Sequence, residues 1–150
     1  MKTRDQLDDA RQIAHIRTLQ LERARVEAQR LAHQLREAKA RERAAEDDLN
    51  AHWHAMRQVL DGPAALSPEL LHNWTGAAAA ARNAHALAAE QAQTAAHEVE
   101  AFRPTLGQHQ RQLDLAESIA DRARRRHDHA CEDAHSAKIE DLFLSHGGRR

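Results

Sequence analysis

The chain has 150 residues and a formal net charge of −1, and 41% of its residues are nominally apolar, including 32 alanines. Two Phe, two Trp and no Tyr leave too little large apolar surface for a compact mixed core, because buried apolar area contributes only about 25 cal/mol per Å². Few β-branched residues exclude a strand-rich fold, and 22 basic against 23 acidic side chains disfavour non-specific nucleic-acid binding.

The first predicted element is one long helix over residues 4–60. Apolar residues recur at alternating steps of three and four from Leu7 to Val59, and thirteen of the sixteen positions on this stripe are apolar. The intervening positions are crowded with Arg, Glu, Gln and Asp. This pattern is typical of a helix that buries one narrow stripe against a partner helix.

A turn is predicted over residues 61–67. Asp61-Gly62-Pro63 ends the first helix, because glycine suits the C-terminal cap and proline cannot continue the hydrogen-bond ladder. Ser67-Pro68-Glu69 then starts a second helix, with a serine cap, proline at the first helical position and an acid near the positive end of the dipole.

The second predicted helix covers about residues 68–144, followed by a frayed tail over 145–150. Its stripe runs from Leu71 to Leu144, and eighteen of its twenty-two positions are apolar. Pro104 and Gly107 interrupt the helix, but the stripe passes them in phase, which favours a kink over a reversal of direction. A reversal would instead give a three-helix bundle broken at Pro104, and this remains the alternative.

The predicted fold is therefore all-α, an antiparallel two-helix coiled-coil hairpin with a longer, kinked C-terminal helix. If Val59 lies opposite Leu71, the numbers of paired residues add to about 130. Leu7 then lies opposite Ala123, and everything after Ala123 lacks a partner within the chain. Residues 1–150 are treated as a single helical hairpin.

Two clusters, one histidine-rich and one aromatic, are candidate sites. The candidates closest to a metal site are His127, Cys131 and His135, which share a helix face; two helical turns separate the outer pair, so the three cannot reach one ion together, and we expect no metal. Trp53, Met56 and Trp74 flank the turn and are predicted to form a hydrophobic plug at the hairpin tip. The alternative is that one tryptophan is exposed there as a docking anchor.

The unpaired C-terminal stretch is the predicted partner-binding element. Its basic residues would steer the approach of a partner, and its large apolar residues would anchor it. The residues of this hypothesis are Arg122, Arg125, Arg126, Ile139, Leu142 and Phe143. Phosphate-binding glycine loops and nucleophile elbows are absent from the sequence, so we expect no catalytic residues, no cofactor and no enzymatic activity.

Nearly the whole chain resembles the small coiled-coil proteins of type III secretion systems, the YscO (SctO) family and its flagellar relative FliJ. The resemblance rests on the Arg-rich first helix and on three short segments: residues 53–60, Leu70-Leu71-His72-Asn73-Trp74, and the tail from Leu113-Asp114-Leu115 through Arg122-Ala123-Arg124-Arg125-Arg126 to Asp141-Leu142-Phe143-Leu144-Ser145-His146. It implies a stalk-like component of the export apparatus that engages a hexameric secretion ATPase, with export chaperones and the export gate as further partners.

The location that follows is cytoplasmic, because the sequence begins with no hydrophobic signal segment and contains no apolar run near the roughly 20 residues of a membrane span. Peripheral attachment to the inner membrane through a secretion complex is left open, as is weak self-association. The rival interpretation is a generic coiled-coil spacer or homo-oligomeric structural protein without a secretion role. The pattern does not separate injectisome from flagellar or unrelated coiled-coil roles.

Overall fold

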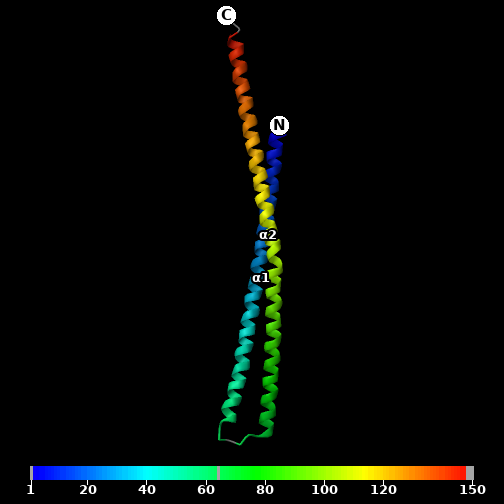
Figure 1. The fold of residues 1–150 in the computed structure, drawn as a ribbon, viewed down its shortest axis with the longest axis vertical. Helices are drawn as coiled ribbons and strands as arrows, with labels where there is room; N and C mark the ends of the chain where they lie inside the picture. The colour runs from blue at the N-terminus through cyan, green and yellow to red at the C-terminus, as the bar shows by residue number, and fades with distance from the viewer. Residues whose placement is uncertain (1, 64, 148–150) are drawn as a thin grey trace. The chain divides into compact units, whose positions relative to one another are not determined.

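The computed structural model describes residues 2–63 and 65–147, which contain two helices and no strand. Helix α1 spans Lys2–Leu60 and helix α2 spans Pro68–Gly147 (Figure 1). The prediction of an all-α fold built from two antiparallel helices is confirmed. The tail expected to be frayed over 145–150 is helical as far as Gly147, while residues 148–150 lie outside the described part of the chain.

The chain ends and restarts its helices with the capping contacts that the local sequence predicts. After α1, the Asp61 amide donates to the carbonyl of Arg57 at 2.9 Å and the Gly62 amide to that of Val59 at 3.3 Å. Before α2, the Ser67 hydroxyl oxygen accepts the amide of Leu70 at 3.3 Å. One of the amides left without a partner at the start of the helix is thereby satisfied.

Helix α2 runs through Pro104, so the chain does not reverse there and the three-helix alternative is wrong. Proline removes one backbone hydrogen bond from the helix at this point. The chain divides into two compact units next to the same residue. One unit combines residues 1–25 with residues 105–150, and the other holds residues 26–104.

In the first unit, α1 and α2 pack antiparallel through small side chains. Leu7 and Ala10 form a buried cluster with Ala123, and Ala120 packs against it. The Leu7 to Ala123 pairing confirms the predicted register, in which the numbers of facing residues add to about 130. Alanine at these positions lets two helix backbones approach closely, because its methyl group occupies little space between them.

In the second unit, the same register continues from Val26 to the turn and from the turn to Pro104. Leu31 lies in one surface groove with Ala101 and Phe102, and Trp53 lies in another with Ala78. The α1 residue that faces a given α2 residue has a lower number as the α2 number rises, so the two helices are antiparallel.

Burial follows the two predicted stripes. All sixteen stripe positions of α1 are at least half-buried, as are those of α2 from Trp74 to Ala130. Leu71 departs from the pattern, with 39% of its surface exposed. Every buried apolar residue of the described chain lies on a stripe: Leu7, Ala10, Leu21, Ala24, Leu31 and Ala38 on α1, and Ala78, Ala81, Ala88, Ala92, Leu113, Ala116 and Ala123 on α2.

Neither of the two described helices is long and apolar enough to cross a membrane.

Candidate protein-docking surfaces

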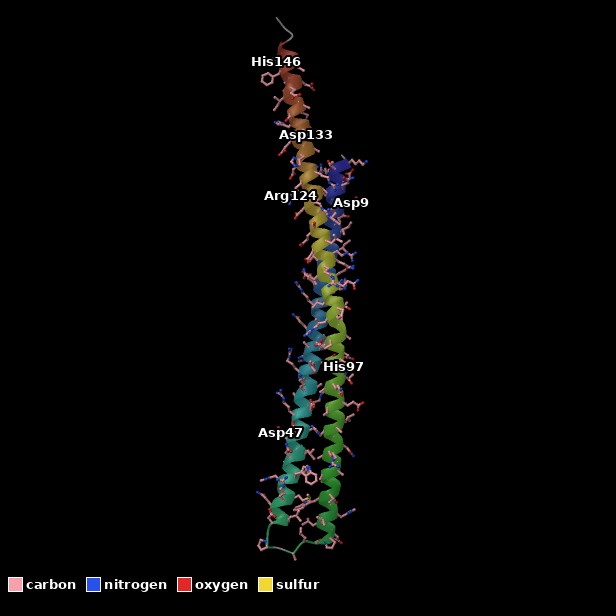
Figure 2. All side chains as sticks on the ribbon, in the orientation of Figure 1. Asp9, Asp47, His97, Arg124, Asp133 and His146 are labelled. Carbon is pink, nitrogen blue, oxygen red and sulfur yellow. The ribbon has the colours of Figure 1, made fainter. Side chains whose placement is uncertain are left out.

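The C-terminal part of α2 continues past the start of α1. Near that start, the Thr3 hydroxyl lies 3.3 Å from Nδ1 of His127. From Cys131 to Gly147 every residue is exposed, and Figure 2 shows the side chains of Asp133 and His146 projecting from this stretch. Three large apolar side chains of this stretch are strongly exposed: Leu142 at 59% and Phe143 and Leu144 at 76%.

The three arginines of the predicted docking element lie just before this stretch. Arg122, Arg125 and Arg126 line a surface groove of about 430 Å³ together with Ile119. Among the ion pairs of the described residues, the neighbouring Arg124 reaches Asp128 at 3.8 Å, whereas these three arginines form none. Arg122 instead donates from Nε to the backbone carbonyl of Ser118 at 3.3 Å. The groove therefore offers cationic groups beside an exposed aliphatic side chain.

The six predicted docking residues do not form one continuous patch. At a rise of about 1.5 Å per residue, Ile139 lies roughly 20 Å along the helix from Arg126. A repeat of 3.5 residues places Arg122, Arg126 and Phe143 on one stripe, which winds slowly around the helix by about 20° per heptad, whereas Leu142 is turned about 100° from Phe143. The structure thus gives an arginine cluster and a separate apolar cluster. Of the adjacent Leu142 and Phe143, only Phe143 lies on the stripe that contains Arg122 and Arg126.

The tip residues flank the turn in a half-buried state. Trp53 and Met56 line a groove of about 150 Å³ with Thr75, Ala78 and Ala79. Trp74 is also half-buried. Leucines around the turn are more open, with exposures of 47% for Leu60, 37% for Leu66, 42% for Leu70 and 39% for Leu71.

Two of the three metal candidates lie close together. Sγ of Cys131 is 3.6 Å from Nε2 of half-buried His127, while His135 is exposed. Across the described residues, no group of three or more His, Cys, Asp or Glu side chains is placed to hold a metal ion. Cys131 is a free, exposed thiol.

Sequence reasoning missed a surface feature that needs both helices. Arg17 donates to Oε1 of Gln20 at 2.9 Å and to Oε1 of Gln112 at 3.0 Å, so these two glutamines lie on the same side of the helix pair. Ile13 precedes Gln20 by seven residues and Ile119 follows Gln112 by seven, which is two turns in each helix. Because the helices are antiparallel, Ile13 and Ile119 come together on that same side.

Two more aliphatic residues extend this feature. Ile16 lies one turn from Ile13 and Leu115 one turn from Ile119, toward the outer surface. Their exposed fractions are 52% for Ile13 and Ile16, 59% for Leu115 and 42% for Ile119. We call these four residues the isoleucine patch. Their signal in the sequence is a large aliphatic residue off the main stripe, but only the register brings the two pairs together.

Arg30 and Glu27 form a bidentate ion pair in the second unit. Arg30 donates to both carboxylate oxygens of Glu27, with 2.9 Å from Nε to Oε2. The hydrogen bond lowers the pKa of Glu27 from its usual value, and the same bond raises the pKa of Arg30. Both side chains are largely solvated, so this pair adds little to stability.

Comparison with known proteins gives no further assignment: no family model, no curated protein sequence and no solved structure matches the chain. The resemblance to secretion stalk proteins therefore stays a prediction from the sequence segments given above.

Proposed function

We propose that this protein is a non-enzymatic component of a type III protein secretion apparatus. It acts as a stalk or adaptor that engages the secretion ATPase, with export chaperones and the export gate as further partners. The observation that carries the proposal is the exposed continuation of α2 beyond residue 130, with its large apolar side chains. The resemblance in sequence to the YscO and FliJ proteins supplies the choice of apparatus.

Physical chemistry supports docking at this continuation. Phe143 at 76% exposure and Leu142 at 59% leave apolar surface in water, and a partner that covers them gains free energy. Ile139 adds a third anchor one helical turn before these two residues, with 41% exposure. The partner surface that fits is an apolar groove on a protein, because amphipathic helices bind such grooves through side chains spaced three and four residues apart.

The arginines give this docking surface its electrostatic preference. Arg122, Arg125 and Arg126 lie at the root of the exposed stretch without acidic partners among the described residues. Such a cluster attracts an acidic protein surface and speeds association more than it strengthens the final complex. We place the protein in the cytoplasm, peripheral to the inner membrane through the secretion complex, and without nucleic acid or a cofactor.

The test is a titration of the purified protein into its cognate secretion ATPase, with ATP hydrolysis and co-sedimentation as readouts. We expect no hydrolysis by the protein alone and a changed ATPase rate at micromolar concentrations of both. Phe143→Asp should weaken the effect at least tenfold. The matched control is Leu87→Asp, since Leu87 is 56% exposed in the other unit and should leave the effect intact.

An ATPase rate that does not respond to the parent protein contradicts the proposal. Equal loss in both variants would contradict the assignment of the C-terminal stretch, because the effect would then not depend on where the apolar residue lies.

The alternative function is a homo-oligomeric coiled-coil protein without a secretion role. The isoleucine patch favours it, because aliphatic side chains on the outer side of paired helices are available to another helix. An inactive ATPase titration combined with stable self-association would favour this alternative.

A further inference from the structure

A second stripe runs along the outer surface of α2, from Leu115 to Phe143 at alternating steps of four and three residues. Every residue on it is exposed. Its two ends are apolar: Leu115 and Ile119 at one end, and Phe143 at the other. Between them the stripe is polar, so the pattern is that of a helix surface with an anchor at each end.

The charges between these ends are divided by sign. Arg122 and Arg126 occupy the first half, and Asp133 and Glu140 occupy the second. None of the four joins an ion pair with another described residue. The first half is basic and the second half is acidic. Two copies of the stripe that run in opposite directions would therefore place opposite charges, and apolar ends, against each other.

We propose that this stripe is the contact surface for a second copy of the same chain, bound antiparallel. In this register the numbers of facing residues add to about 262. Phe143 of each copy covers Ile119 of the other, and Arg122 faces Glu140. Each contact occurs twice, as a two-fold symmetric interface requires.

The isoleucine patch explains why the end of the stripe at Leu115 and Ile119 can bind Phe143 of the second copy. Ile13 and Ile16 of α1 lie beside Ile119 and Leu115, so an incoming Phe143 meets aliphatic side chains from two helices. A phenylalanine moved from water onto such a surface gains more than it would on a single helix, because more apolar area is covered.

A second copy is needed because the chain cannot make this contact with itself. Residues 119 and 143 belong to one continuous helix, and at about 1.5 Å per residue they lie roughly 36 Å apart. A parallel second copy would place Arg122 beside Arg122 and Glu140 beside Glu140. Repulsion between these like charges selects the antiparallel orientation.

The dimer does not depend on the proposed secretion function, but it bears on it. Arg122, Arg126 and Phe143 belong both to this stripe and to the surface assigned to a secretion partner. A copy bound on the stripe covers them, so self-association and partner binding compete. Because apolar contacts are confined to the ends and the charges are solvated, the dimer is weak and weakens further in high salt.

The decisive experiment is a charge exchange on the full-length chain, measured by sedimentation equilibrium at low ionic strength. Arg122→Glu and Glu140→Arg each place like charges opposite one another, and each should weaken the dimer at least tenfold. An equimolar mixture of the two variants restores both contacts, and so does the chain that carries both substitutions. We expect dimer in these two samples at close to the parent level.

Three results would overturn the proposal. One is a parent chain that stays monomeric at the highest soluble concentration in low salt. Another is single variants that dimerise as well as the parent. The third is a mixture and a double variant that stay as monomeric as the single variants while their circular dichroism matches the parent. The circular dichroism separates loss of the contact from loss of the fold.

Cross-linking tests the register. In a Cys131→Ser background, Arg126→Cys with Ser136→Cys leaves both apolar ends and the contact of Arg122 with Glu140 in place. It should oxidise to a disulfide-linked dimer in which peptide 126 is joined to peptide 136. The control chain carries Gln108→Cys with Ser136→Cys, which is about 27 Å out of register, and should link poorly. Equal linkage in both chains, or links between two copies of peptide 126, would contradict the antiparallel register.

Discussion

Helix α2 carries one stripe of small apolar residues through two different environments. Ala116 and Ala123, in the stretch that faces α1, are 5% and 3% exposed. Ala134 and Ala137 continue the same stripe at the same spacing, yet both are exposed. The pattern therefore specifies which side of a helix can pair, and the length of the partner helix decides where pairing stops.

This comparison separates two meanings of an apolar stripe. Where α1 is present, the stripe removes Leu113 from water to 8% exposure, and its burial stabilises the fold. Beyond the first residues of α1, Leu144 keeps 76% of its surface exposed and contributes nothing to folding. An apolar surface that stays exposed and does not stabilise the fold marks a binding surface.

The largest effect we predict comes from a Leu→Asp substitution, compared between the paired and the unpaired part of α2. Leu113→Asp buries an unpaired carboxylate in the packed stripe and should lower the free energy of unfolding by about 3 kcal/mol or more. Leu144→Asp should change it by less than about 0.5 kcal/mol, because the side chain is already in water. Denaturant titrations followed by circular dichroism measure both. Similar losses would show that residue 144 is packed in solution.

Truncation should give an intermediate effect that locates the end of the paired region. A chain ending at Ala130 lacks residues 131–147, all of which are exposed, and should keep the stability of the parent. A chain ending at Asp121 loses Ala123, which covers Leu7 and Ala10, and should lose about 1–2 kcal/mol. Thermal unfolding of the two chains checks this difference. Equal stability would place the end of the pairing before residue 121.

Much of this fold is readable from local signals in the sequence. The stripes predict the buried faces, and the Ser67-Pro68-Glu69 start of α2 agrees with its observed cap. The register follows from the turn, since a short connection fixes which residues face each other, and Leu7 does meet Ala123. These features depend on neighbours in sequence or on one connection, so one chain is sufficient to predict them.

Other features depend on distances that the sequence does not express. Leu71 lies on the stripe but is 39% exposed, because a residue one turn from the start of α2 has less helix around it to cover it. The isoleucine patch joins residues about 100 positions apart, so only the observed Arg17 to Gln112 bond shows that they share a side. Leu142 and Phe143, which the docking hypothesis treats alike, lie about 100° apart around α2.

The smallest effect we predict comes from the position next to a buried leucine. Leu31 is 8% exposed on the stripe, whereas neighbouring Arg30 is off the stripe, solvated and paired with Glu27. The pKa of Glu27 is lowered in the folded chain, so its contribution is present above the unfolded pKa and is lost as pH falls through the folded value. Arg30→Ala should therefore shift the melting temperature only marginally at pH 7 and not at all in acid, where Glu27 is protonated. Melting curves of the parent and variant from pH 7 down to pH 3 test this. A difference in melting temperature that grows in acid would have the wrong sign for this ion pair. A large difference at pH 7 would mean that a solvated charge, and not the apolar stripe, holds this part of the two helices together.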